Sequence, residues 1–242
     1  MAIDINKIKG IILDYGGTLD TGGDHWGEVI WDAWQKAGVA ADKAQFRECY
    51  VFAERELART LHILPHHDFK DLLYIKMQIE LQHLCEMGAF APADVDSAAQ
   101  KISDICHGVA KDNINAVKPV LKKLGEKYPL VLVSNFYGNI STVLKEFGID
   151  DIFKKVIESA VVGVRKPDPA IFIMGAEALG EKPENILVIG DSYTKDIEAA
   201  VKAGCQAIWL KGRQWSEKEE QQFYPDTIRK FDEVLSLLDF KE

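Results

Sequence analysis

The sequence is short of cysteines and of long apolar runs, and each shortage excludes a class of protein. Only four cysteines occur in 242 residues, and no two of them form a C-x-x-C pair. A zinc framework and a secreted disulfide scaffold are therefore not expected. No apolar run approaches the ~18 residues that a membrane-spanning helix needs, and the N-terminal segment lacks the apolar region of a signal peptide. We expect a cytoplasmic protein without a membrane partner.

The sequence also has fewer basic residues than acidic ones. The chain has 38 Asp and Glu residues against 29 Lys and Arg residues, which gives a formal net charge of −9. Domains that bind nucleic acid normally present a basic face, so nucleic acid is not expected as a partner. Hydrophobic residues make up 47% of the chain and charged residues 28%, a balance typical of globular proteins rather than disordered ones. The acidic excess permits a metal site without indicating one.

Short β-prone runs occur once near the start of the chain and then repeatedly in its second half. The first, Ile8–Leu13, stops at Asp14 and is followed by two glycines. The later runs alternate with helical stretches and comprise Leu130–Val133, Val156–Glu158, Ile186–Ile189 and Ala207–Leu210. Strands separated by helices predict right-handed crossovers and a parallel sheet, which the first run most simply joins.

Between these two regions, from about residue 24 to residue 113, the sequence contains no convincing strand. Apolar residues recur there at steps of three and four, as from Trp26 to Ala37, which predicts helices. The fold class is therefore α/β: a doubly wound, Rossmann-like parallel-sheet core with an inserted α-helical cap domain. We expect residues 1–20 and 114–242 to form the core and residues 21–113 to form the cap. Helical spacing from Ile228 to Leu238 predicts a last helix that docks on the core.

Polar residues follow three of the predicted strands at the point where each strand ends. They are Asp14, the pair Ser134-Asn135, and Asp191. Each of them alone is more often a helix cap or a turn residue. Open α/β sheets bind ligands at the carboxyl ends of their strands, however, and Lys166 lies in a proline-punctuated loop of the same region. Together these residues predict one site.

The chemistry-bearing residues fall into four motifs whose order and spacing resemble those of the haloacid dehalogenase superfamily of phosphotransferases. The motifs are Asp14-Tyr-Gly-Gly-Thr-Leu19, Leu132-Val-Ser-Asn135, Lys166-Pro-Asp-Pro169 and Gly190-Asp-Ser-Tyr-Thr-Lys-Asp196. The predicted helical insertion after the first motif is similar to the type-1 cap of that superfamily. Only the tail after Lys211 lies outside the resemblance.

The resemblance implies a Mg²⁺-dependent hydrolase, a phosphatase or phosphotransferase, that acts on a small phosphorylated metabolite through an aspartyl-phosphate intermediate. It implies Asp14 as the nucleophile, with Lys166 and Ser134 as further catalytic residues. The implied metal ligands are Asp14, the backbone carbonyl of Gly16, Asp191 and Asp196. The implied phosphate-binding residues are Gly17, Thr18, Ser134, Asn135 and Lys166.

The chain departs from the superfamily pattern at Gly16. Phosphatases of the superfamily normally carry a second aspartate there, which protonates the leaving group and later activates water. A general acid and base of this kind contributes ~10²–10⁴ in rate. One interpretation is a phosphatase that acts on acyl or aryl phosphates, whose leaving groups need little protonation, or that takes its acid from elsewhere. The possible substitutes are Asp20, His25, His62, His66 and His67.

Two other interpretations remain open. The chain could cleave C–P or C–halogen bonds, as phosphonatases and dehalogenases of the superfamily do. Dehalogenases need no metal, so Asp191 and Asp196 argue against that branch, whereas phosphonatases carry a cap lysine. The available cap lysines are Lys36, Lys43, Lys70 and Lys76. The chain could also be a degenerate member that binds a phosphometabolite or a protein without turnover.

Overall fold

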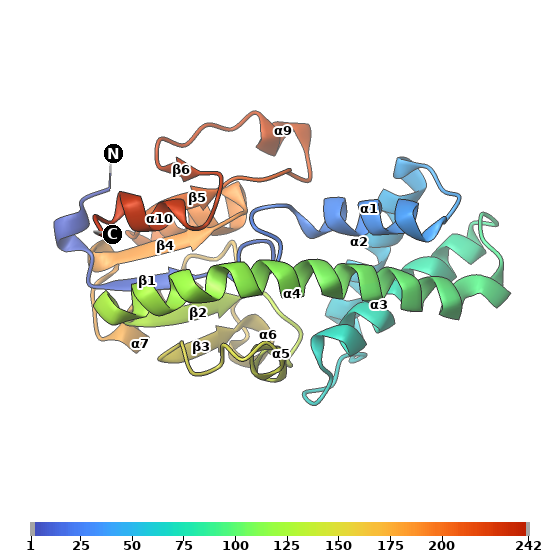
Figure 1. Ribbon diagram of the computed structural model, residues 1–242, viewed down its shortest axis with the longest axis horizontal. Helices are drawn as coiled ribbons and strands as arrows, with labels where there is room; N and C mark the ends of the chain where they lie inside the picture. Colours follow the sequence, from blue (N-terminus) through green and yellow to red (C-terminus); the bar gives the residue numbers. More distant parts are fainter. Residues whose placement is uncertain (1–2, 241–242) are drawn as a thin grey trace.

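The computed structural model describes residues 3–240 and contains a six-stranded sheet in which every strand pair is parallel. The order is β3-β2-β1-β4-β5-β6, so β1 lies in the middle of the sheet (Figure 1). The strands are β1 (Gly10–Leu13), β2 (Leu130–Ser134), β3 (Lys155–Glu158), β4 (Ile186–Gly190), β5 (Gln206–Leu210) and β6 (Thr227–Ile228). Each of the five predicted strands is confirmed within two residues at either end.

Both faces of the sheet are buried, because successive side chains of a strand point to opposite faces. Ile12 packs in one cluster with Phe172 of α7 (Ala170–Leu179), near the short helix α8 (Ala199–Ala203). Ile11 and Leu13 pack on the other face in a cluster shared with α4 (Val95–Lys127), α5 (Ile140–Glu146) and α10 (Glu233–Leu237). Two further short helices are α6 (Ser159–Val162) and α9 (Glu217–Glu220). The doubly wound core is confirmed.

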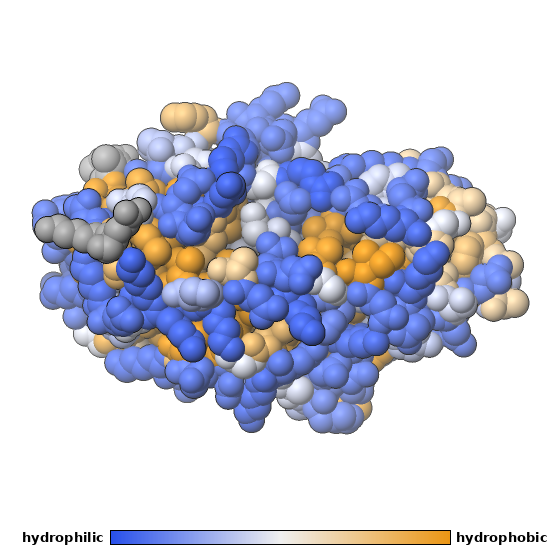
Figure 2. Space-filling view, in the orientation of Figure 1, coloured by the Kyte–Doolittle hydropathy of each residue, from blue (hydrophilic) through white to orange (hydrophobic). Residues whose placement is uncertain are grey.

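A helical lobe lies beyond the carboxyl ends of the strands (Figure 1). It consists of α1 (Trp26–Ala37), α2 (Lys43–Arg59), α3 (Phe69–Glu86) and the first part of α4. Asp42 and Asp68 each accept a hydrogen bond from the third residue of the following helix and so cap α2 and α3. On the face seen in Figure 2, hydrophilic residues cover most of both parts, and apolar side chains show only in patches.

Helix α4 joins the lobe to the core without a break. Apolar spacing predicts separate helices over 93–109 and 117–127, but the structure has one helix of 33 residues. Asp112, Asn113 and Asn115 are only mildly unfavourable in a helix, and the buried side chains of Ala110 and Ile114 continue the apolar face through them. The predicted boundary between residues 113 and 114 therefore falls inside α4. The division into core and cap stays a prediction, and its first two and last two residues lie outside the described part.

The C-terminal tail docks on the core as predicted, but a single helix from Ile228 to Leu238 is wrong. Ile228 belongs to β6, which pairs with β5, and only α10 is helical. Ile228, Val234 and Leu238 are all buried in the core cluster. A strand of two residues has no periodicity of its own, so the pattern could not separate it from the helix that follows. No helix within residues 3–240 combines the length and apolar character that crossing a bilayer requires.

The lobe buries one carboxyl group without a partner, and this makes its stability depend on pH. Glu80 of α3 is fully buried, and neither of its side-chain oxygens has a hydrogen-bond partner among the described residues. Burial raises its pKa to about 8, although Lys76 acts in the opposite direction. A raised folded-state pKa means that the stabilising contribution is complete below the unfolded-state value of ~4.3 and is lost as pH rises through about 8.

We predict that Glu80→Gln stabilises the protein at pH 8.5 and changes little at pH 5. The gain at pH 8.5 is expected to be about 2–5 kcal/mol, because the variant no longer ionises inside the lobe. Urea unfolding at the two pH values measures the difference. Glu126→Gln, at an exposed position of α4, is the control and should show no such dependence. Equal effects of Glu80→Gln at both pH values would contradict the prediction.

Candidate active site

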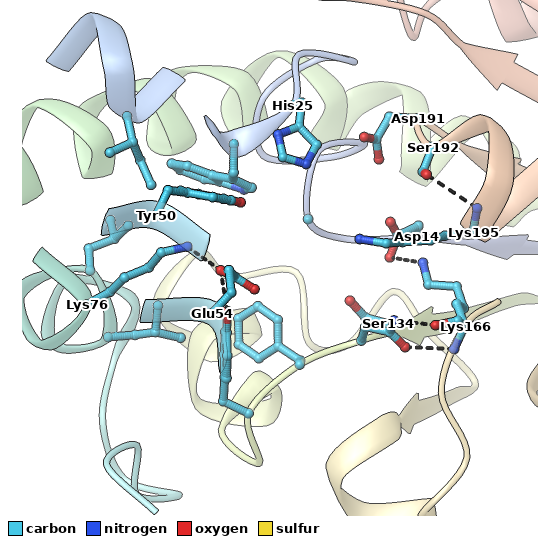
Figure 3. A pocket seen from close by; sticks show the side chains of 18 of the residues that line it. Asp14, His25, Tyr50, Glu54, Lys76, Ser134, Lys166, Asp191, Ser192 and Lys195 are labelled. Atoms are coloured by element: carbon cyan, nitrogen blue, oxygen red, sulfur yellow. Dashed lines mark hydrogen bonds and ion pairs between the residues drawn. The ribbon is translucent and has the colours of Figure 1, made fainter. Parts of the chain in front are cut away.

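The predicted site residues come together at the carboxyl edge of the sheet. Asp14 follows β1, Ser134 ends β2 and Asp191 follows β4, while Lys166 enters on the loop before α7. The backbone N–H of Asp14 donates to the carbonyl of Ile189 at 3.1 Å, which ties the ends of β1 and β4 together. All four polar side chains face a cavity between the sheet and the helical lobe (Figure 3).

Three carboxylates surround one ammonium group. Oxygen atoms of Asp14, Asp191 and Asp196 lie within 4.8 Å of one another, and all three residues are buried. The Lys166 Nζ is 2.7 Å from Asp14 Oδ1 and 2.6 Å from Asp196 Oδ1. One ammonium against three buried carboxyl groups leaves an excess of negative charge when all three are ionised, and burial makes that excess costly.

The pKa values of these buried groups reflect the same excess of negative charge. Burial raises the pKa of Asp14 to about 6, although Lys166 opposes the shift. Burial also raises the pKa of Asp191 well above its usual range, and the charges of Asp196 and Asp14 add to it. Burial disfavours the Lys166 ammonium, but Asp14 and Asp196 outweigh that effect and raise its pKa. Clustered hard oxygen donors with surplus negative charge fit a divalent cation such as Mg²⁺.

The loop after Asp14 is shaped around Asp191. Gly17 has a φ of +95°, and a Cβ there would come within 2.3 Å of Asp191 Oδ2. The hydroxyl of Thr18, in the same loop, donates to Asp191 Oδ1 at 2.9 Å and so orients this carboxylate. Gly17 N–H donates to Asp20 Oδ1 at 2.7 Å. The glycine is needed for its backbone conformation and for the close approach of a carboxylate.

Two residues place Lys166 and Asp196. The Asn135 side chain accepts from the Lys166 N–H and donates to the Lys166 carbonyl, both at 2.9 Å, so it holds the backbone of Lys166; its contact with phosphate stays a prediction. The Ser192 N–H donates to Asp196 Oδ2 at 3.0 Å within the π-helical turn Tyr193–Glu198. A Cβ on Gly190 would come within 2.4 Å of Asp196. The sequence reasoning assigned no role to Gly190 or Ser192.

The cavity has a volume of about 140 Å³. Its core side carries the residues described above. Its lobe side is mainly aromatic and aliphatic, with two charged residues, and is formed by His25, Trp26, Ile30, Tyr50, Glu54, Phe69, Leu72, Leu73 and Lys76. Tyr50, Glu54 and Lys195 were not predicted. Helical spacing shows which face of a helix is buried, but not whether that face meets a core or a cavity.

Of the five possible substitutes for the missing acid, only His25 lines this cavity. Both oxygens of Asp20 are engaged, since Oδ1 accepts from Gly17 and Oδ2 accepts from Trp26 Nε1 at 3.0 Å. Burial raises the pKa of Asp20 to about 8, although these two hydrogen bonds lower it. His62, His66 and His67 do not line the cavity.

Of the four cap lysines, only Lys76 lines the cavity. It is paired with Glu54, and its Nζ lies 4.2 Å from the centre of the Tyr50 ring. Burial disfavours its charge, yet Glu54, Tyr50, Tyr137 and Glu80 together outweigh this and raise the pKa of Lys76 well above its usual range. Lys43 and Lys70 instead form ion pairs with Glu28 and Asp104, each at 2.6 Å.

The comparisons with known proteins identify the family of the chain. A model of the haloacid dehalogenase-like hydrolases matches residues 8–204, and the chain belongs to this family. Its curated relatives include the 5-amino-6-(5-phospho-D-ribitylamino)uracil phosphatase YigB of Escherichia coli, 36% identical over 38% of this chain and 37% of that protein. Another is the glyceraldehyde 3-phosphate phosphatase of Pyrococcus furiosus, 31% identical over 49% and 50% of the two chains. These matches span half or less of either relative's length.

Solved structures extend the likeness of fold over nearly the whole chain. A dehalogenase with an intermediate complex is 16% identical, covers 96% of this chain and 97% of its own, and has a TM-score of 0.63. The β-phosphoglucomutase of Clostridium difficile is 17% identical with the same coverage and a TM-score of 0.50. At such identities the likeness establishes the fold.

We predict that Gly17→Ala disrupts the site, whereas Gly180→Ala only strains the backbone. Gly180 has a similar φ of +76° at the end of α7, but a Cβ there meets nothing within 4 Å. The left-handed backbone should cost each variant about 1–2 kcal/mol in urea unfolding, and Gly17→Ala should cost more, because its Cβ also displaces the Asp191 carboxylate. Only Gly17→Ala should lose Mg²⁺-dependent phosphate release from acetyl phosphate. Equal activities of the two variants would show that Asp191 does not need the close approach.

Proposed function

We propose that the protein is a Mg²⁺-dependent phosphoric monoester hydrolase that acts on a small phosphorylated metabolite. The observation that carries this proposal is the buried group of Asp14, Lys166, Asp191 and Asp196, which opens onto a cavity enclosed by the helical lobe. The names of relatives support it, since these proteins are described as phosphatases of small phosphorylated compounds.

Asp14 is the proposed nucleophile. Its Oδ1 is bound by Lys166, which leaves Oδ2 to attack phosphorus. The bond from phosphorus to the leaving-group oxygen breaks as the new Asp14–phosphorus bond forms, and water then hydrolyses the aspartyl phosphate. Lys166 and Ser134 bind phosphoryl oxygens, and their hydrogen bonds stabilise the charge that develops there.

The proposed metal ligands are Asp14, Asp191 and the backbone carbonyl of Gly16, with Asp196 as a further ligand or a partner of Lys166. A bound Mg²⁺ would offset the repulsion between the Asp14 carboxylate and an anionic phosphate. The charge excess of the three carboxylates supports this assignment.

The lobe gives less support to cleavage of C–P bonds. A lysine that attacks a carbonyl group needs a neutral amine, whereas Glu54 keeps the Lys76 ammonium charged. The retained Asp191 and Asp196 also argue against a dehalogenase, which needs no metal.

His25 offers partial compensation for the aspartate that Gly16 replaces. A backbone N–H can only donate, and that of Gly27 donates to His25 Nδ1 at 3.0 Å. The neutral ring therefore carries its proton on Nε2. Burial, helped by the charge of Lys195, lowers the pKa of His25 to about 3. His25 thus stays neutral and can donate a hydrogen bond to a leaving-group oxygen, but it cannot protonate it as a strong acid does. Acyl and aryl phosphates suit such a site best.

We predict that Asp14→Asn lowers phosphate release from acetyl phosphate and phenyl phosphate by at least about 10³-fold. The change removes the attacking carboxylate while keeping its shape. Chelation with EDTA should abolish the wild-type activity, and added Mg²⁺ should restore it. Asp168→Asn, in the exposed part of the Lys166 loop, is the matched control and should keep full activity. Full turnover by Asp14→Asn would show that Asp14 is not the nucleophile. No turnover of either substrate by the wild type would favour a binding protein.

We predict that Gly16→Asp raises the turnover of alkyl phosphates about 10–100-fold, and that of aryl phosphates less. A Cβ at this position has its nearest neighbours, atoms of the Trp26 indole, 3.9 Å away, so the structure has room for it. An alkoxide needs a proton as it leaves, whereas a phenolate needs it less. An unchanged ratio of the two rates would mean that the acid is already supplied by another group.

His25→Asn is the companion variant for the same pair of substrates. Asparagine keeps an oxygen that can accept from the Gly27 N–H, but it lacks the Nε2 donor. We expect its turnover of alkyl phosphates to fall about tenfold, and this loss to shrink when Gly16→Asp is also present.

A further inference from the structure

A second, larger cavity adjoins the candidate active site. It has a volume of about 440 Å³ and lies between the end of α2 and the core loops that follow β2 and α6. Its wall is continuous with that of the first cavity, because five residues line both: Glu54, Asn135, Phe136, Tyr137 and Lys195. The two cavities are therefore direct neighbours that share part of one wall, and we name the second the outer cleft.

The outer cleft is positively charged in a chain of net negative charge. Arg59, Arg165 and Lys195 line it from three separate elements of the chain. None of the three has a carboxylate within 4 Å among the described residues, which the ion pairs of residues 3–240 would otherwise include. These cations are thus free to bind a ligand.

The one acidic residue that lines the outer cleft is already engaged. Glu54 Oε1 accepts hydrogen bonds from Lys76 of the lobe and, at 3.1 Å, from the Tyr137 hydroxyl of the core. Lys76 and Tyr137 therefore offset its charge before any ligand arrives. Glu54 also stands at the join between the two cavities, so a chain of ligand atoms passing from one to the other would run beside it.

Lys195 connects the two cavities. It follows Asp191 by four residues, and its side chain reaches into the space between Asp14 and the lobe (Figure 3). Its positive charge lowers the pKa of both His25 and Glu54, where burial is the larger influence on each. Lys195 therefore places a positive charge between the proposed phosphoryl position at Asp14 and the two arginines of the outer cleft.

We propose that the outer cleft binds a second anionic group, a phosphate or carboxylate, of the same substrate whose reacting phosphoryl group lies at Asp14. This inference rests on the proposed function, and it narrows the substrate to phosphorylated metabolites that carry two separated anionic ends. Guanidinium groups suit the task, because each can form two parallel hydrogen bonds to a phosphate or carboxylate.

The test uses ligands that cannot be turned over. Alkane α,ω-bisphosphonates of increasing chain length and the matching alkyl monophosphonates are titrated into the wild-type protein with Mg²⁺ by calorimetry. Two equivalent ends alone would give a bisphosphonate a twofold advantage. We expect at least one chain length to bind ~10-fold or more tightly than its monophosphonate, which is ~1.4 kcal/mol.

Variants then locate the second anion. Arg59→Gln and Arg165→Gln should each reduce this advantage by about threefold or more, while the affinity for monophosphonates stays within about twofold. Both residues are exposed and neither touches the candidate active site, so folding is not at risk. Arg55→Gln is the control, since Arg55 is exposed on the same helix α2 but lines neither cavity.

The outcomes separate this inference from the function on which it rests. If monophosphonates bind with Mg²⁺ but no bisphosphonate gains more than twofold, the outer cleft is not an anion site and the proposed function still stands. An advantage that survives both arginine changes would place the second anion elsewhere and overturn the inference. If neither class of ligand binds in the presence of Mg²⁺, the proposed function and the inference fail together.

Discussion

The ammonium of Lys166 between Asp14 and Asp196 is the interaction on which the rest of the site depends. Burying a carboxylate costs several kcal/mol unless an opposite charge accompanies it, and here three carboxylates are buried together. Several local hydrogen bonds position this one ammonium group and its partners. Asn135 binds the backbone of Lys166 on both sides, and Ser192 turns Asp196 toward it. Lys166 offsets only part of the negative charge of the three carboxylates, and a divalent cation would offset more of it.

The backbone close to these carboxylates is as constrained as the side chains. Gly17 and Gly190 leave no space between the chain and the two aspartates that they face. The lobe covers the site with side chains that are mainly aromatic and aliphatic, and an apolar surrounding strengthens the charge interactions inside it. Under the proposed function, catalysis at Asp14 and selection of the substrate belong to different parts of the chain. The sheet edge carries the buried carboxylates and Lys166, the lobe adds mainly apolar side chains, and the outer cleft adds positive charge.

Much of the fold could be predicted because its signals are local. Runs such as Ile8–Leu13 are buried on both faces, and their ends point to one edge of the sheet, so Asp14, Ser134 and Asp191 could be placed together before the structure was seen. The continuity of α4 and the pairing of β6 could not, because both depend on packing between distant segments. Tyr50, Glu54 and Arg59 lie on predicted helices, but which helix faces meet across the cavity is decided by how the lobe sits on the core.

Single residues likewise divide into those whose role local sequence predicts and those whose role depends on packing between distant segments. Asp20 was a reasonable substitute acid by its position in the sequence, yet Gly17 and Trp26 occupy its oxygens. His25 owes its lowered pKa to burial, helped by the charge of Lys195, and the Trp215 ring is stacked on it with ring centroids 5.0 Å apart. Trp215 lies in the tail beyond the four motifs, a region to which the motif resemblance assigned no role in the site.

Helix α4 has a mechanical consequence. At 1.5 Å per residue its 33 residues form a rod of about 50 Å, whose two ends are packed in different parts of the molecule. Arg213 adds a second tie, since it leaves the core after β5 and pairs with Asp24 and Asp32 of the lobe. A lobe swinging away as a rigid body would bend the rod and break these pairs. The lobe and the core are therefore joined both by one continuous helix, with Pro119 inside it, and by the ion pairs of Arg213.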